Sequence, residues 1–303
     1  MGSSSHTATI EDDQRHVPGP ASLPLWNESF WFPCYDPRTE IGVVFRAGMH
    51  PNRQEANLYV FITHHGAVVH SLVDQRAPLP AFAPQALAIS GLRMEWESRE
   101  RFQLHYAHAT HGFDLVWEGC TPTYRYPIAP ETTADQVSRH IEHAGVVTGT
   151  VTIGGEVHRI DCLGHRDHSW GGERDWNTFY SWDYLSGEID RDFWFNAVRI
   201  QFFPEMPDLH IGCVWAGNEV LELAEIKMDV RTADGGTRQL GVTAELIDAR
   251  RRPHVIVAEE ILVNCVVQFG RTWLKDGIAR YRYGDRVGYG IHEHGYIEGA
   301  RAR

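Results

Sequence analysis

Residues 146–176 read VVTGTVTIGGEVHRIDCLGHRDHSWGGERDW, and this stretch decides the class of fold. Residues 146–153 and 157–163 are rich in β-branched side chains, and the pair Gly154-Gly155 separates them. Two such runs across a Gly-Gly pair are typical of a β-hairpin. The second run leads directly into a polar motif at residues 164–171, GHRDHSWG.

The rest of the chain repeats this pattern on both sides of the motif. Short alternating or β-branched runs separated by turn residues predict strands. The predicted strands lie at residues 41–45, 58–63, 67–73, 87–96, 102–107, 113–118, 179–185, 193–202, 210–215, 220–230, 238–247, 254–267, 272–283 and 287–292. One helix is expected at residues 133–143, where Thr133 and Gln136 form a capping box and Gly145 follows as a stop. So little helix favours antiparallel barrels or sandwiches over a parallel sheet.

The length of 303 residues exceeds that of one average domain. We expect a polar leader at residues 1–24, an N-terminal barrel at residues 25–164, and a C-terminal barrel at residues 165–303 that begins with the motif. Small antiparallel barrels of about eight strands hold one small ligand, as lipocalins do. The predicted fold is therefore all-β, with two lipocalin-like barrels and one short helix.

Charge and composition restrict the partners. The chain has 28 basic and 40 acidic residues and a net charge of −12, which disfavours binding to nucleic acid and to anionic membranes. No run approaches the ~20 apolar residues of a membrane helix. Five widely spaced cysteines are an odd number without a Cys-x-x-Cys pair, which is typical of reduced residues. We expect a soluble, cytoplasmic protein that does not insert into membranes and binds a neutral or cationic small molecule; the sequence does not indicate its oligomeric state.

The motif concentrates groups that can transfer protons. Asp167, flanked by His168 and Trp170, could supply an acid and a stiff wall beside a substrate. Burial among aromatic rings would raise the pKa of the Asp167 carboxyl, whereas Arg166 and Arg174 would lower it, and the sequence does not decide which effect is larger. The alternative interpretation is a polar turn whose side chains bind their own backbone.

Aromatic residues gather at the end of the motif and after it. Such a concentration either fills a barrel or lines a cavity for an apolar ligand, and acids and histidines interleaved with the rings favour a cavity. The candidate ligand-binding rings of this region are Trp170, Trp176, Tyr180, Trp182 and Trp194.

The end of the chain carries a pattern that resembles a metal motif. His292-Glu293-His294 with Glu298 could place two imidazoles and a carboxylate on one strand. No second motif follows to supply another histidine, so His292 and Glu293 are assigned to the polar lining or rim of the last strand. P-loop and dinucleotide fingerprints are absent from the sequence. We therefore expect no metal and no cofactor.

The motif is similar to the Gly-Tyr-x-Asp-His-x-Trp-Gly stretch of the carotenoid 1,2-hydratase (hydroxyneurosporene synthase)-like family, which is related to AttH-like proteins. Residues 27–31, NESFW, and 49–52, MHPN, resemble the N-terminal half of the same family. The resemblance implies two lipocalin-like barrels of the calycin type, with the motif near their junction. It also implies that Asp167 is the acid that protonates an isoprenoid alkene, with His168 and Trp170 as neighbours. His165 replaces the family's tyrosine.

These observations favour a cofactor-independent hydratase or isomerase for a terpenoid, steroid-like or aromatic alkene. Asp167 would be the acid, with His168 and His165 as further catalytic residues. Trp31, from the first half of the chain, is added to the rings that would bind substrate. The alternative is a non-catalytic carrier of a hydrophobic molecule, in which Asp167 only orients its loop. An acid that faces a cavity favours the enzyme, and an Asp167 that caps turn amides favours the carrier.

Overall fold

The computed structural model describes residues 11–19, 22–127 and 138–300. Strands account for 72% of the chain and helices for 4%, so the predicted all-β fold is confirmed. The chain forms two compact units, Met1–His65 with Val69–Arg174 and Gly66–Val68 with Asp175–Arg303. In the part of the chain that is described, no helix is long and apolar enough to cross a membrane.

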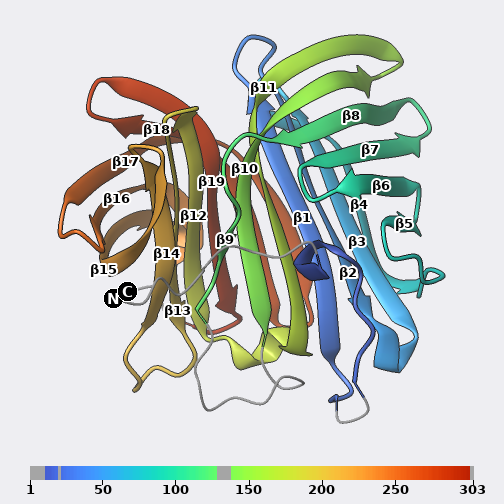
Figure 1. The fold of residues 1–303 in the computed structure, drawn as a ribbon, viewed down its shortest axis with the longest axis horizontal. Helices are drawn as coiled ribbons and strands as arrows, with labels where there is room; N and C mark the ends of the chain where they lie inside the picture. The colour runs from blue at the N-terminus through green and yellow to red at the C-terminus, as the bar shows by residue number, and fades with distance from the viewer. Residues whose placement is uncertain (1–10, 20–21, 128–137, 301–303) are drawn as a thin grey trace. The chain divides into compact units, whose positions relative to one another are not determined.

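The first unit is a nearly closed, barrel-like antiparallel sheet of eleven strands (Figure 1). The strand order is β4-β3-β2-β1-β11-β10-β8-β7-β6-β5, and β9 pairs with β10. The strands are β1 (Trp26–Asp36), β2 (Ile41–His50), β3 (Glu55–His64), β4 (Ala67–Pro78), β5 (Ala86–Ile89), β6 (Leu92–Ser98), β7 (Arg101–His108), β8 (His111–Gly119), β9 (Tyr124–Arg125), β10 (Arg139–Ile153) and β11 (Glu156–Glu173). Two 3-10 helices, η1 (Glu11–Asp13) and η2 (Pro51–Arg53), precede β1 and β3.

Successive side chains of a strand point to opposite faces of the sheet. On β1, Phe30 and Phe32 belong to the hydrophobic core of the first unit, whereas Trp31 between them does not. Val43 and Phe45 of β2 join the same core. Complete burial of one such side chain stabilises the fold by about 1.5–3 kcal/mol. The face that holds Phe30 is called the inner face below, and the face that holds Trp31 is called the outer face.

The second unit is a closed barrel of eight antiparallel strands, in which β19 pairs with both β18 and β12 (Figure 1). Its strands are β12 (Ser181–Asp190), β13 (Phe193–Gln201), β14 (Leu209–Ala216), β15 (Glu219–Ala233), β16 (Arg238–Asp248), β17 (Pro253–Phe269), β18 (Thr272–Tyr283) and β19 (Arg286–Ile297). Two 3-10 helices, η3 (Trp176–Thr178) and η4 (Asp234–Gly236), complete the unit. Phe193, Phe195 and Tyr281 lie in its core.

The predicted hairpin at Gly154-Gly155 is confirmed. β10 and β11 pair from Ile153↔Glu156 back to Arg139↔Trp170, and both turn glycines have positive φ angles of 61° and 91°. β11 does not end before the motif but continues through it to Glu173. The two compact units meet between Arg174 and Asp175, and the motif pairs with both β10 and β1 of the first unit.

The helix predicted at residues 133–143 is wrong where the structure describes it. Residues 133–137 lie outside the described residues, and residues 139–143 form the start of β10. Ile141 pairs with His168 on one side and with Arg125 on the other. The local capping signal is therefore overridden by backbone pairing with two neighbouring strands. Among the described residues, helix is limited to the four 3-10 turns.

A test of the packing concerns Gly145 on β10. A Cβ atom at Gly145 would lie 2.4 Å from Cε2 of Trp117, a fully buried side chain. We expect Gly145→Ala to lower the free energy of unfolding by about 1–3 kcal/mol, because the buried indole and the backbone carbonyl of Glu118, 2.6 Å from the added Cβ, would have to shift. Urea denaturation measures this change. In a double-mutant cycle, Trp117→Phe should reduce the cost of Gly145→Ala, and an unchanged cost would contradict the proposed clash.

Candidate functional site

The motif on β11 presents its side chains to two different faces. Arg166 lies on the inner face, with its guanidinium carbon 4.7 Å from the centre of the Phe102 ring. His168 lies on the same face and stacks on Phe30 with 4.0 Å between ring centres. Asp167, between them, points to the outer face and is the cross-strand partner of Trp31 on β1. The residues predicted to flank the acid therefore do not share its surroundings.

The outer face holds a cluster of four ionisable side chains, called the Asp167 cluster: Asp167, His165, His140 and Glu142. Glu142 on β10 is the cross-strand partner of Asp167 and is fully buried. Its carboxylate accepts hydrogen bonds from Nε2 of His140 and Nε2 of His165, both at 2.6 Å. Nε2 of His140 also lies 3.9 Å from Oδ2 of Asp167. One imidazole nitrogen thus faces two carboxyl groups.

Burial and neighbouring charges give the two carboxyl groups of the cluster very different pKa values. Burial raises the pKa of Asp167 to about 7, although His140 opposes this shift and Glu142 adds to it. Burial alone would also raise the pKa of Glu142, but the His140 and His165 imidazoles hold it at about 2. Burial would lower the pKa of His140, yet the neighbouring Glu142 raises it above its usual value. At neutral pH the arrangement is an ion pair of Glu142 and His140 beside a carboxyl group that can carry a proton.

The sequence did not show whether burial or the nearby arginines have the larger effect on the pKa of Asp167, and in the structure burial has the larger effect. Burial outweighs the cations, and the guanidiniums that lower the pKa of Asp167 are those of Arg46 and Arg174. Arg166 lies on the opposite face, where its Nη1 is 2.8 Å from Oδ1 of Asp13. Two carboxyl groups with pKa values this far apart are the usual sign of an acid and its charged partner.

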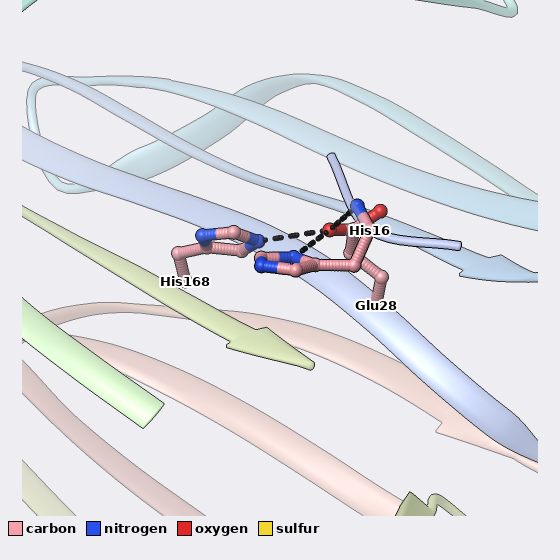
Figure 2. A group of neighbouring side chains, drawn as sticks. All are labelled: His16, Glu28 and His168. Carbon is pink, nitrogen blue, oxygen red and sulfur yellow. Dashed lines mark hydrogen bonds and ion pairs between the residues drawn. The ribbon is translucent and has the colours of Figure 1, made fainter. Parts of the chain in front are cut away.

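A second group of polar side chains lies on the inner face. Figure 2 shows the rings of His16 and His168 directed at the carboxylate of Glu28. Nδ1 of His16 is 2.9 Å and Nε2 of His168 is 3.2 Å from Oε1 of Glu28. Trp170 belongs to this face as well, because it stacks on His16 with 4.5 Å between ring centres. His168 and Trp170 therefore surround Glu28 instead of Asp167.

The second unit contains the remaining polar candidates. His292 and His294 both contact Oδ1 of Asp183, through Nε2 at 3.2 Å and Nδ1 at 2.9 Å. Oδ2 of the same aspartate pairs with Arg199. The two histidines hold the pKa of Asp183 well below its usual value against the effect of burial. The two histidines thus share Asp183 as a partner, and Glu293 accepts a hydrogen bond from Trp182 Nε1.

Two of the predicted aromatic residues of the second unit, Trp176 and Trp182, stack on each other. Trp176 on η3 lies 5.4 Å from the ring of Phe269 and 5.8 Å from that of Trp182. Trp194 is 1% exposed and Tyr180 is partly exposed. A pocket in this unit contains about 580 Å³ of space, part of it open solvent, and is lined by Trp182, Asp183, Arg199, His294 and Tyr296 among others. Of the predicted substrate-binding residues, Trp31 is the one paired with Asp167.

Sequence reasoning missed His140, Glu142 and Glu28. His140 and Glu142 fall in the span that was predicted as a helix, where residues two apart do not share a face. In a strand they do, so the His-x-Glu pattern of residues 140–142 was the available signal. Glu28 belongs to the quoted NESFW stretch, but its partner His168 is 140 residues away. Only the fold brings these two together.

A family model described as a domain of unknown function, DUF7064, matches residues 9–296. The chain belongs to this family. No curated protein matches the DUF7064 chain. Among solved structures, an AttH-like protein from Nitrosomonas europaea is 12% identical, has a TM-score of 0.66, and the match covers 92% of this chain and 99% of that one.

Two further solved structures share the fold of this DUF7064 protein. Kievitone hydratase from Nectria haematococca is 13% identical with a TM-score of 0.65, over 96% of this chain and 94% of that one. CghA is 10% identical with a TM-score of 0.61, over 96% and 95%. At these identities the likeness establishes the two-unit β architecture.

Proposed function

We propose that this protein is a hydratase or isomerase that protonates a carbon–carbon double bond of an apolar substrate, with Asp167 as the general acid. The observation that carries the proposal is the Asp167 cluster. A carboxyl group on the outer face of β11 lies beside the His140–Glu142 pair and has Trp31 as its cross-strand partner. A group that donates protons near neutrality needs a pKa close to the operating pH, and burial raises the pKa of Asp167 to about 7.

In the proposed reaction, the proton of Asp167 is transferred to one alkene carbon, and the π electrons form the new C–H bond. The other carbon becomes a cation. For hydration, water adds its oxygen to that carbon and the resulting oxonium loses a proton to the Asp167 carboxylate. For isomerisation, a different C–H bond breaks and its proton returns to the same carboxylate. In both outcomes the acid is regenerated without a co-reactant.

His140 is proposed to control the protonation of Asp167. Its Nε2 faces both carboxyl groups of the cluster, and Glu142 keeps the imidazole protonated. A positive charge close to Asp167 stabilises the carboxylate that forms after proton transfer. The indole of Trp31 would stabilise a cationic intermediate by a cation–π interaction of about 0.5–2 kcal/mol.

Two comparisons support the class of reaction. Kievitone hydratase has the same fold over nearly the whole chain, and the motif of residues 164–171 resembles that of carotenoid 1,2-hydratases, with His165 in place of their tyrosine. An isoprenoid or aromatic alkene is therefore the proposed substrate class. The position of Asp167 supports the enzyme over the carrier, because the residue lies within β11 and not at a turn.

Isotopic labelling tests the class of reaction. Protein purified from cells is first analysed by native mass spectrometry, and any retained lipophile is extracted and identified. This molecule is then tested as a substrate together with a panel of isoprenoid and aromatic alkenes. In deuterated water, the product should carry a non-exchangeable deuterium on carbon. Label from oxygen-18 water should appear only if the reaction is hydration.

The Asp167→Asn variant should incorporate neither label at a comparable rate. A ligand that binds but is recovered unlabelled after prolonged incubation would support the carrier function for that ligand. The same result across the whole panel would refute the hydratase or isomerase proposal.

A further inference from the structure

We propose that His16, Glu28 and His168 bind one divalent transition-metal ion, with zinc as the ion of choice. This inner-face group is separate from the Asp167 cluster and plays no part in the function proposed above. The sequence predicted no metal, because these three residues come from the leader, from β1 and from β11. The fold gathers them at one point (Figure 2).

The distances suit a common ion. One ligand atom from each residue can be chosen so that all three lie within 4.8 Å of one another. Oε1 of Glu28 is already 2.9 Å from Nδ1 of His16 and 3.2 Å from Nε2 of His168. Two ligands that lie ~2.0–2.1 Å from a tetrahedral zinc ion are ~3.3 Å apart. Small movements of the rings are therefore enough to admit the ion.

The aromatic surroundings fix the ring planes. His168 lies between Phe30 and Trp170, with ring centres 4.0 and 4.8 Å away. His16 stacks almost parallel to Trp170, with 3° between the planes. A donor set whose rings are held by packing loses little conformational freedom when it binds an ion.

Burial and charge favour a cation at this point. Glu28 is 1% exposed and His168 is fully buried. Burial would raise the pKa of Glu28, but the two imidazoles lower it, and burial lowers the pKa of His168. A carboxylate and a neutral imidazole are the forms of these side chains that bind metals. Nε of Arg15 lies 4.0 Å from the other carboxylate oxygen, Oε2, and leaves Oε1 to the histidines.

The donor types select the kind of ion. Imidazole nitrogen suits zinc, copper, iron and nickel, whereas Mg²⁺ and Ca²⁺ prefer sites made of oxygen atoms. Two histidines and one glutamate are also the protein ligands of known zinc sites that keep a fourth position open. The side chain of His16 is 24% exposed, so solvent can reach the group from the leader side. The ion would attach the leader to the sheet of the first unit.

The test uses Zn²⁺ and the full chain, after treatment with EDTA and dialysis. Isothermal titration should show one high-affinity equivalent per chain. X-ray absorption spectroscopy at the zinc edge should show two imidazole nitrogens and one or more oxygens at ~2.0–2.2 Å from the ion. Limited proteolysis should cut the leader more slowly when Zn²⁺ is present.

Three variants define the site. His16→Ala removes the partly exposed ligand, and Glu28→Gln keeps the shape of the buried one; each should weaken Zn²⁺ binding by more than ~100-fold, since loss of an outer-shell partner alone costs 10–100-fold. His111→Ala is the matched control, because it removes a partly exposed histidine that is not part of this group and stacks on His70 with 5.1 Å between ring centres. This control should leave the high-affinity site unchanged.

Circular dichroism and thermal melting check that each variant is folded. If Glu28→Gln fails to fold, His16→Ala alone decides, since its side chain is partly exposed. Zn²⁺ binding that persists in His16→Ala, or that is lost in His111→Ala, would overturn the proposal. Wild-type protein that shows no saturable high-affinity binding would overturn it as well.

Discussion

Replacing Asp167 by asparagine is expected to reduce turnover by about 10²–10⁴-fold while the affinity for the ligand changes little. Asparagine keeps the shape of the side chain and can form hydrogen bonds, but it carries no acidic proton. The His140–Glu142 pair at 2.6 Å remains in the variant, so the effect reports the missing acid. Turnover of the alkene identified by labelling provides the measurement, and ligand binding is measured separately.

The matched control is Asp161→Asn, on the same strand. The side chain of Asp161 is exposed, and the residue contacts Asp36 through its backbone nitrogen, which the substitution retains. This variant should turn over substrate within a few fold of wild type. Activity of Asp167→Asn within the same range would remove Asp167 from the mechanism, and weakened binding with unchanged turnover would assign it to substrate binding.

The fold was largely readable from local patterns. The β-branched runs on each side of Gly154-Gly155 predicted the hairpin of β10 and β11, and turn pairs elsewhere predicted most strands. These patterns depend only on residues that are neighbours in the sequence, so they can be recognised without knowledge of the fold. The exception is the start of β10, where a capping signal at Thr133 and Gln136 predicted a helix. Pairing of Ile141 with His168 and Arg125 depends on distant residues, and no local pattern contains it.

The site was readable only in part, for a geometric reason. Residues 164–171 are crowded with ionisable groups, and a turn would have gathered them around one point. Because they form a strand, Asp167 and His168 point to opposite faces, and their partners come from β10 and β1. Glu142 raises the pKa of Asp167, and Glu28 forms a hydrogen bond with His168. One dense motif therefore contributes to two separate groups, and the sequence indicates neither set of partners.

The electrostatics of Asp167 imply a cost in stability. A carboxyl group whose pKa is raised in the folded state is protonated more readily there than in the unfolded chain. Between the two pKa values the folded state binds more protons, so stability falls as pH rises. A shift from 3.8 to about 7 corresponds to roughly 4 kcal/mol at 1.36 kcal/mol per pKa unit. Because 17% of the side chain is exposed, solvent screening reduces this figure, and we expect about 2–4 kcal/mol.

Asp167→Asn should therefore stabilise the protein at alkaline pH, although it is expected to reduce turnover. The sign follows from the titration: below about pH 4 the aspartate is neutral in both states and the variant gains nothing from the lost charge. Between about pH 4 and pH 7, Asp167 of the wild-type protein is ionised in the unfolded chain but still protonated in the folded protein. The wild-type protein therefore loses stability as the pH rises, whereas the variant does not. Above about pH 7 the difference is constant. Urea denaturation at a series of pH values, in buffers with EDTA to exclude metal ions, measures the difference between the two proteins.

Asp161→Asn again provides the comparison, because it removes the same formal charge from an exposed position on the same strand. Comparing the two pH series separates the effect of the buried position from that of the change in net charge. A flat difference for Asp167→Asn would show that the Asp167 carboxylate is not disfavoured in the folded protein, and the acid would then be ionised at neutral pH. The expected result is instead that the free energies of unfolding of Asp167→Asn and wild type diverge by about 2–4 kcal/mol between pH 4 and pH 7. This result would demonstrate, without any substrate, that the folded protein is less stable because it keeps a proton on this carboxyl group.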